Sequence, residues 1–208
     1  MTPPRQPSAA PRRSPKLARL LEDIRACQVC DLPHGRRPIL AASATARVLL
    51  AGQAPGSKVH ARGVPWDDAS GDTLRAWLGV DRATFYDADR FAIVPMGFCY
   101  PGKGRSGDLP PRPECAQTWH GTLMPLLKGV ELTVVIGSYA QAYHLGDRAK
   151  PTLTETVRAF HDYLPRLCVL PHPSPRNRPW LARNPWFEAE LVPLLRARVA
   201  ATLSSRRG

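Results

Sequence analysis

The sequence is poor in several features, and each shortage excludes a class of protein. No apolar run approaches the roughly 18 residues that a membrane-spanning helix needs, so we expect no membrane partner. The first sixteen residues lack the apolar stretch of a secretory signal peptide, and we therefore expect a cytoplasmic, bacterial-type protein. A reducing compartment disfavours disulfides among the five cysteines.

Acidic residues are scarce relative to basic ones. The chain has 17 Asp and Glu against 29 Lys and Arg, a formal net charge of +12. Removing the six basic residues that lie near the two ends still leaves +6, so the remainder is itself basic; the six are Arg5, Arg12, Arg13, Lys16, Arg206 and Arg207. A surplus of this size favours a polyanionic partner, because each neutralised phosphate releases condensed counterions.

The chain has enough apolar material for one folded domain. Its 208 residues are 43% hydrophobic, which excludes a wholly disordered chain. Residues 1–14 are expected to form a basic, Pro/Arg-rich disordered tail, residues 15–200 a single domain, and residues 201–208 a basic C-terminal tail. A helix is predicted to begin with Ser14 as its cap and Pro15 in its first turn. We expect a monomer.

Four short β-rich runs, each bounded by Gly or Pro, alternate with helical segments. The predicted strands are 47–51, 91–95, 132–136 and 167–170, and the predicted helices are 71–78, 116–127, 139–145 and 186–200. This alternation is typical of an α/β fold with a parallel sheet covered on both faces. Since ligands bind at the carboxyl ends of such strands, we expect the active site in the loops after the first and fourth strands.

Those two loops have unusual compositions. Residues 52–56 read Gly-Gln-Ala-Pro-Gly, which allows a tight turn and close approach of backbone N–H groups to a ligand. Residues 171–177 read Pro-His-Pro-Ser-Pro-Arg-Asn, and the three prolines stiffen a loop that carries several polar groups. His172 is either a structural histidine or a catalytic one.

Four of the cysteines have the spacing of a metal centre. Cys27 and Cys30 form a C-x-x-C pair, and Cys99 and Cys115 follow with fifteen residues between them. From spacing alone, zinc and an iron–sulfur cluster are equally good interpretations, and unligated thiols are a third. Cys168 lies in an apolar run and is predicted to be a core residue.

Together the two loops resemble the signature loops of the uracil-DNA glycosylase superfamily. Residues 172–177 are most similar to the single-strand-selective monofunctional branch, whereas the cysteine order is similar to the family-four branch, which carries a [4Fe–4S] cluster. The resemblance extends roughly from residue 17 to residue 198. It implies a three-layer α/β/α sandwich with a central four-stranded parallel sheet. It also favours a structural [4Fe–4S] cluster over zinc.

The function that the resemblance implies is hydrolysis of the N-glycosidic bond of a deaminated base, uracil first, in DNA. This glycosidase reaction begins base excision repair. His172 would hydrogen-bond the developing negative charge on the departing base, and backbone amides of Gly52, Gln53 and Ala54 would contribute to the same site.

The segment at 63–68 is similar in position to the family segment whose aromatic residue stacks on the flipped base. Trp66 is the candidate for stacking, although a core tryptophan is the alternative. Asp67 and Asp68 are candidates for orienting the attacking water, and Asp68 could equally cap the next helix.

Basic and polar residues near both signature regions are expected to grip DNA. The candidates are Ser174, Arg176, Asn177, Arg178, Lys103 and Arg105.

Two departures from the family pattern bear on activity. Ala54 stands where many relatives have a water-activating Asp or Asn, and the stretch 94–99 lacks the Asn that usually reads the base edge. Hypoxanthine and xanthine are therefore open as substrates. No lysine lies in residues 52–56 or 171–177, which predicts a monofunctional enzyme without lyase activity. The competing hypotheses are a damaged-DNA-binding protein without turnover and a zinc-stabilised nucleic-acid module.

Overall fold

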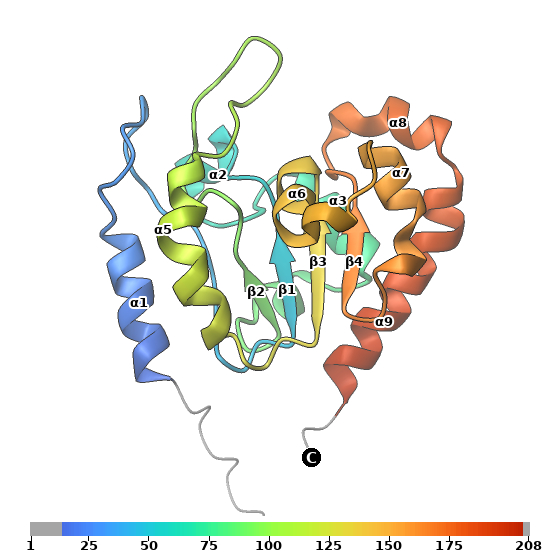
Figure 1. Ribbon diagram of the computed structural model, residues 1–208, viewed down its shortest axis with the longest axis horizontal. Helices are drawn as coiled ribbons and strands as arrows, with labels where there is room; N and C mark the ends of the chain where they lie inside the picture. The colour runs from blue at the N-terminus through green and yellow to red at the C-terminus, as the bar shows by residue number, and fades with distance from the viewer. Residues whose placement is uncertain (1–13, 206–208) are drawn as a thin grey trace, which may run out of the picture.

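The computed structural model describes residues 14–205 and contains a four-stranded parallel sheet between two layers of helices (Figure 1). This arrangement confirms the predicted three-layer α/β/α sandwich. The predicted tail at 1–14 lies almost wholly outside the described residues. The helices and strands are α1 (Pro15–Arg25), β1 (Val48–Ala51), α2 (Ser57–Arg62), α3 (Ala69–Leu78), α4 (Arg82–Tyr86), β2 (Phe91–Ile93), α5 (Pro113–Leu123), β3 (Leu132–Ile136), α6 (Ser138–Leu145), α7 (Leu153–Arg158), β4 (Leu167–Leu170), α8 (Arg178–Arg183) and α9 (Val192–Ser204).

The sheet order is β2-β1-β3-β4, and all pairs are parallel. The chain first builds outward from β1 to β2 and then returns to the other side of β1 to place β3 and β4. The direction of winding therefore reverses between β1 and β3. In open α/β sheets a ligand binds at the carboxyl ends of the strands beside such a reversal.

The two faces of the sheet are covered by different helices, because side chains alternate along each strand. Leu49 of β1 packs in a cluster with the apolar residues of α1 and α5. Its neighbours Val48 and Leu50 point to the opposite face, where the cluster includes Leu74 of α3 and Leu195 of α9. Figure 1 shows α1 and α5 on one side of the strands and α9 on the other.

The first helix forms as the sequence predicts. The Ser14 side chain accepts a hydrogen bond from the backbone N–H of Leu17, and Pro15 occupies the first turn. Leu17, Leu21 and Ile24 are buried. This apolar stripe holds α1 against the sheet and α5, and the chain leaves the helix directly into Cys27.

The C-terminal helical region differs from the prediction of one helix over 186–200. A π-helical segment η5 (Phe187–Leu191) precedes α9, which continues to Ser204. Pro193 stands in the first turn of α9 and has no N–H to donate to the preceding turn, which accounts for a change of helical winding there. The predicted domain end at residue 200 lies inside α9, where Thr202 is buried.

Candidate active site

One pocket of about 540 Å³ lies at the carboxyl ends of the strands. Its wall includes the loop after β1, the residues around the end of β2 and the loop after β4, so the structure brings both signature loops to the same place. Trp66 adds a further part of the wall. Asp108 and Leu109 also line it, and they come from the long loop between β2 and α5 that projects from the body of the molecule (Figure 1).

Gly52 and Trp66 form one side of the pocket. A Cβ atom added at Gly52 would lie 2.9 Å from Cζ2 of Trp66, closer than real Cβ contacts. Glycine is therefore needed at this position for the indole to approach the first loop. Both residues line the pocket, together with Gln53 and Ala54. The structure thus places all four predicted base-binding residues in the lining of one pocket.

The ring of His172 lies next to the ring of Trp66 in the wall of the pocket. The two ring centroids are 5.6 Å apart, and the ring planes are inclined by 33°. The backbone of His172 is held from its own loop, because the Asn177 side chain donates a 2.7 Å hydrogen bond to the His172 carbonyl. Asn177, predicted to contact DNA, thus has a structural role in this arrangement.

Burial favours the neutral form of His172. Desolvation lowers the pKa of the imidazole below its ordinary value, and the carboxylates of Asp68 and Asp108 oppose this without reversing it. A lowered pKa keeps the ring neutral at neutral pH. A neutral imidazole can donate one hydrogen bond to an oxygen that gains negative charge during a reaction.

Asp67 and Asp68 have different surroundings. Asp68 lines the pocket, and its Oδ1 accepts a 2.9 Å hydrogen bond from the Gly71 N–H at the start of α3. Asp67 is not among the lining residues. Its carboxylate pairs with Arg82 at 2.8 Å and Arg62 at 3.2 Å, and the hydrogen bond from Arg82 is the main cause that lowers the pKa of Asp67. The structure therefore brings only Asp68 to the pocket.

The candidate DNA-binding residues fall into two groups. Ser174 and Arg176 line the pocket, and Arg176 donates a 3.2 Å hydrogen bond to the Ser106 carbonyl of the projecting loop. The side chains in the second group, all exposed, lie on that loop or at the start of α8; they are Lys103, Arg105 and Arg178.

The four predicted metal-binding cysteines line one small pocket where the projecting loop begins and ends. This pocket brings together Cys27, Cys30, Cys99 and Cys115. Within residues 14–205, no three His, Cys, Asp or Glu side chains are already arranged to hold a single metal ion. Cys168 lies elsewhere and is fully buried in β4, as predicted.

The electrostatics of this cysteine pocket are unfavourable for free thiolates. Burial is the largest cause that raises the pKa of Cys30, Cys99 and Cys115, and neighbouring cysteine thiolates raise each one further. For Cys115 the pKa rises to about 12. Hydrogen bonds point to the sulfurs, including one of 3.3 Å from the Phe98 N–H to Cys115 Sγ. These four cysteines are the residues that could hold a thiolate-bound metal group, which would have to displace the protons of their thiols.

Two charged residues that line the pocket were missed in the sequence analysis. Asp108 lies 64 positions before His172, and no motif marks it; only the closure of the loop between Cys99 and Cys115 could have indicated its approach. Lys58, in the first turn of α2, also lines the pocket and is exposed. It lies just beyond the first signature loop, so the prediction that the loops lack lysine did not cover it.

The stretch after β2, where relatives usually carry an Asn, is hydrogen-bonded through its backbone to the first loop. The Met96 and Gly97 N–H groups donate to the carbonyls of Gly52 and Gln53 at 2.8 and 2.9 Å. Pro95 lines the pocket. This side of the pocket therefore supports the first loop and offers no amide side chain to a base.

The protein is thus a parallel α/β sandwich in which the loops after β1 and β4 line one pocket, and an imidazole lies next to an indole in its wall. Residues 41–196, three quarters of the chain, match the family model described as Uracil DNA glycosylase superfamily. The chain belongs to this superfamily. Membership supports a DNA glycosylase function in general, and it makes DNA a partner. Among the described residues, no helix is long and apolar enough to span a membrane.

Proposed function

We propose that this protein hydrolyses the N-glycosidic bond of a deaminated base in DNA, with uracil as the first candidate, and so begins base excision repair. The observation that carries the proposal is the juxtaposition of His172 and Trp66 at 5.6 Å in a pocket to which both signature loops contribute. A flipped base needs an aromatic surface to stack on and a hydrogen-bond donor at its oxygen, and these two side chains supply them.

In this mechanism the bond between base and sugar breaks with positive charge on the sugar and negative charge on the base. The neutral His172 donates a hydrogen bond to the base oxygen as that charge develops. Backbone N–H groups of residues 52–54 provide further donors. Asp68, whose Oδ1 is fixed by the Gly71 N–H, orients the water that adds to the sugar, because Ala54 carries no polar group that could do so. The proton that this water releases neutralises the departing base anion.

We infer that the enzyme is monofunctional. A lyase would need an uncharged amine to form a Schiff base, and such lysines occupy desolvated sites or lie beside another cation. Lys58 lines the pocket but is exposed to solvent. Borohydride added during the reaction should trap no covalent complex between the protein and DNA. A trapped complex that disappears in Lys58→Ala would contradict this inference.

A second candidate is a protein that captures damaged DNA without releasing the base. Ala54 and the amide-free stretch after β2 favour it, because both positions lose groups that relatives use. The test is chromatographic detection of free base from single- and double-stranded oligonucleotides that contain uracil, hypoxanthine or xanthine. Release from at least one substrate supports the enzyme. Tight binding with no release at any protein excess supports the alternative.

We also propose that Cys27, Cys30, Cys99 and Cys115 hold a structural [4Fe–4S] cluster, as in the family-four branch. Their shared pocket and the N–H donor to Cys115 Sγ support a thiolate-bound group. When bound, the cluster ties the projecting loop to the end of α1. Protein purified without oxygen should contain about four iron and four sulfide per chain, whereas one zinc per chain would contradict the proposal.

A further inference from the structure

The turn at residues 65–67 has an unusual backbone. Trp66 has a φ of 57°, the only positive φ outside glycine among the described residues. This left-handed conformation costs free energy in a bulky side chain, so the surroundings must hold it. The turn also lies directly on α3, because a Cβ added at Gly71 would be 1.7 Å from the Trp66 carbonyl oxygen.

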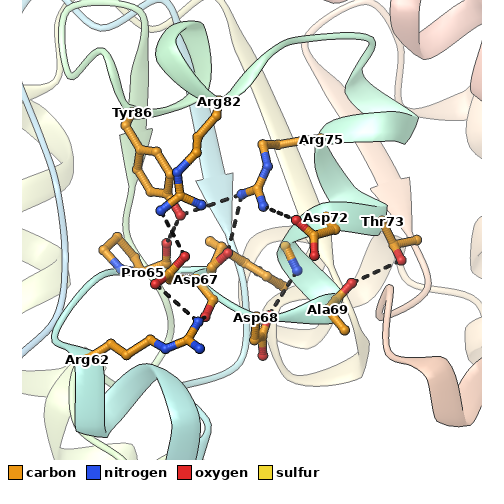
Figure 2. A network of polar contacts seen from close by, with 12 residues as sticks. Arg62, Pro65, Asp67, Asp68, Ala69, Asp72, Thr73, Arg75, Arg82 and Tyr86 are labelled. Carbon is orange, nitrogen blue, oxygen red and sulfur yellow. Dashed lines mark hydrogen bonds and ion pairs between the residues drawn. The ribbon is translucent and has the colours of Figure 1, made fainter.

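Three successive carbonyl groups of this turn are held by side chains from three different helices. Tyr86 Oη of α4 donates a 2.9 Å hydrogen bond to the carbonyl oxygen of Pro65. Arg75 Nη1 of α3 donates to the Trp66 carbonyl at 3.3 Å, and Arg62 Nη1 of α2 donates to the next carbonyl at 2.7 Å. Figure 2 shows these side chains approaching the turn from opposite sides.

Arg75 is the centre of this arrangement. Only 7% of the residue is exposed, and its second terminal nitrogen pairs with Asp72 at 2.6 Å. The guanidinium carbon also lies 5.2 Å from the Phe85 ring centroid and 5.8 Å from that of Tyr86. A planar guanidinium held by ring faces and a carboxylate has little freedom. Arg75 is therefore a fixed donor for the backbone of Trp66.

We propose that Arg75 and Tyr86 are positioning residues that hold Trp66 in its left-handed conformation and thereby set the shape of the pocket that receives the flipped base. The inference rests on the proposed function. Neither side chain lines the pocket, so both act through Trp66. The rigid turn makes shape the basis of selection, which suits a pocket whose β2 side offers no amide to read the base edge.

The first test uses Tyr86→Phe, which removes only the hydroxyl that donates to Pro65. Its matched control is Tyr163→Phe, which loses a comparable 2.8 Å hydrogen bond to the Arg148 carbonyl outside the pocket lining. Under single-turnover conditions with saturating enzyme, we expect Tyr86→Phe to slow base release about tenfold, the equivalent of one hydrogen bond. Affinity for undamaged DNA should change less than about twofold, and the control should match the wild type.

A double-mutant cycle separates positioning from a general loss of stability. In a Trp66→Ala background, Tyr86→Phe should have no further effect on the rate, because the residue that it positions is gone. Equal rate losses in both backgrounds would overturn the inference. Arg75→Lys, which keeps the charge but loses the planar fork, should behave like Tyr86→Phe.

Hydrogen exchange gives a readout that does not depend on activity. The amides of residues 66–69 should exchange faster in Tyr86→Phe and Arg75→Lys than in the wild type and in Tyr163→Phe. Unchanged exchange in both variants would overturn the inference, even if the protein is a glycosylase. Absence of base release by the wild type would instead overturn the proposed function, and exchange would still decide whether these residues order the turn.

Discussion

Gly52 directly follows β1 and His172 comes just after β4, and Trp66, in the turn between α2 and α3, lies against both residues. The absence of a side chain at Gly52 makes room for the indole. The indole in turn lies against the imidazole, and burial there lowers the pKa of His172.

Replacing Gly52 by alanine should reduce activity through Trp66. The new Cβ would lie 2.9 Å from the ring, so Trp66 must move. We expect the rate of base release to fall at least about tenfold, because a displaced Trp66 would hold the base in the wrong position for reaction. Gly121→Ala is the control, since its Cβ meets nothing within 4 Å in α5. That variant should keep full activity and gain up to about 1 kcal/mol of stability. Equal activity in both variants would contradict the account.

Asp68→Asn should lower the rate of base release by about 100-fold if its carboxylate orients the water. Asn is also a good helix cap, so α3 should remain intact. Asp81→Asn is a matched control because Asp81 caps α4 in the same way, with a 2.7 Å hydrogen bond from the Thr84 N–H. The comparison is of single-turnover rates alongside melting temperatures. An Asp68→Asn rate like that of the control would remove Asp68 from the mechanism.

At the scale of elements, the strands and the two loops could be predicted because their signals are local. β3 and β4 have the predicted bounds, and β1 and β2 differ only at their ends. The helices α2, α4, α7 and α8 were missed, since five or six residues give too little periodicity to read. The approach of Asp108 to His172 was also missed, because it depends on how a long loop closes in three dimensions.

Removing the proposed metal group should loosen the loop between Cys99 and Cys115. Lys103 and Arg105 are exposed on this loop, and tethering at both ends limits its access to a protease. In Cys115→Ala, which should lose iron, trypsin should cut after these two residues at least about tenfold faster than in the wild type. Cys168→Ala is the control, because that cysteine is a core residue outside the cysteine pocket. Equal cleavage in both variants would contradict the tether.

At the scale of the whole molecule, stability should fall in mild acid. Burial is the main cause that lowers the pKa of His144 to about 4, and the nearby His120 adds to it. In the unfolded chain this histidine binds a proton near pH 6.5. The free energy of unfolding is therefore undiminished above that pH and falls as the pH drops from 6.5 to 4, because only the unfolded chain readily takes up the proton. The loss is at most about 3 kcal/mol. Urea unfolding of wild type and His144→Leu at pH 7.5 and 5 checks this, and equal pH dependence in both would contradict it.

The central claim is that a neutral His172 facing Trp66 makes this pocket a site of base excision. The most direct measurement is the amount of free uracil released from a uracil-containing oligonucleotide by excess wild-type protein and by His172→Ala, with DNA affinity measured in parallel. We expect complete release by the wild type, a rate at least about 100-fold lower in the variant, and similar affinities. Equal rates in both proteins would contradict the claim.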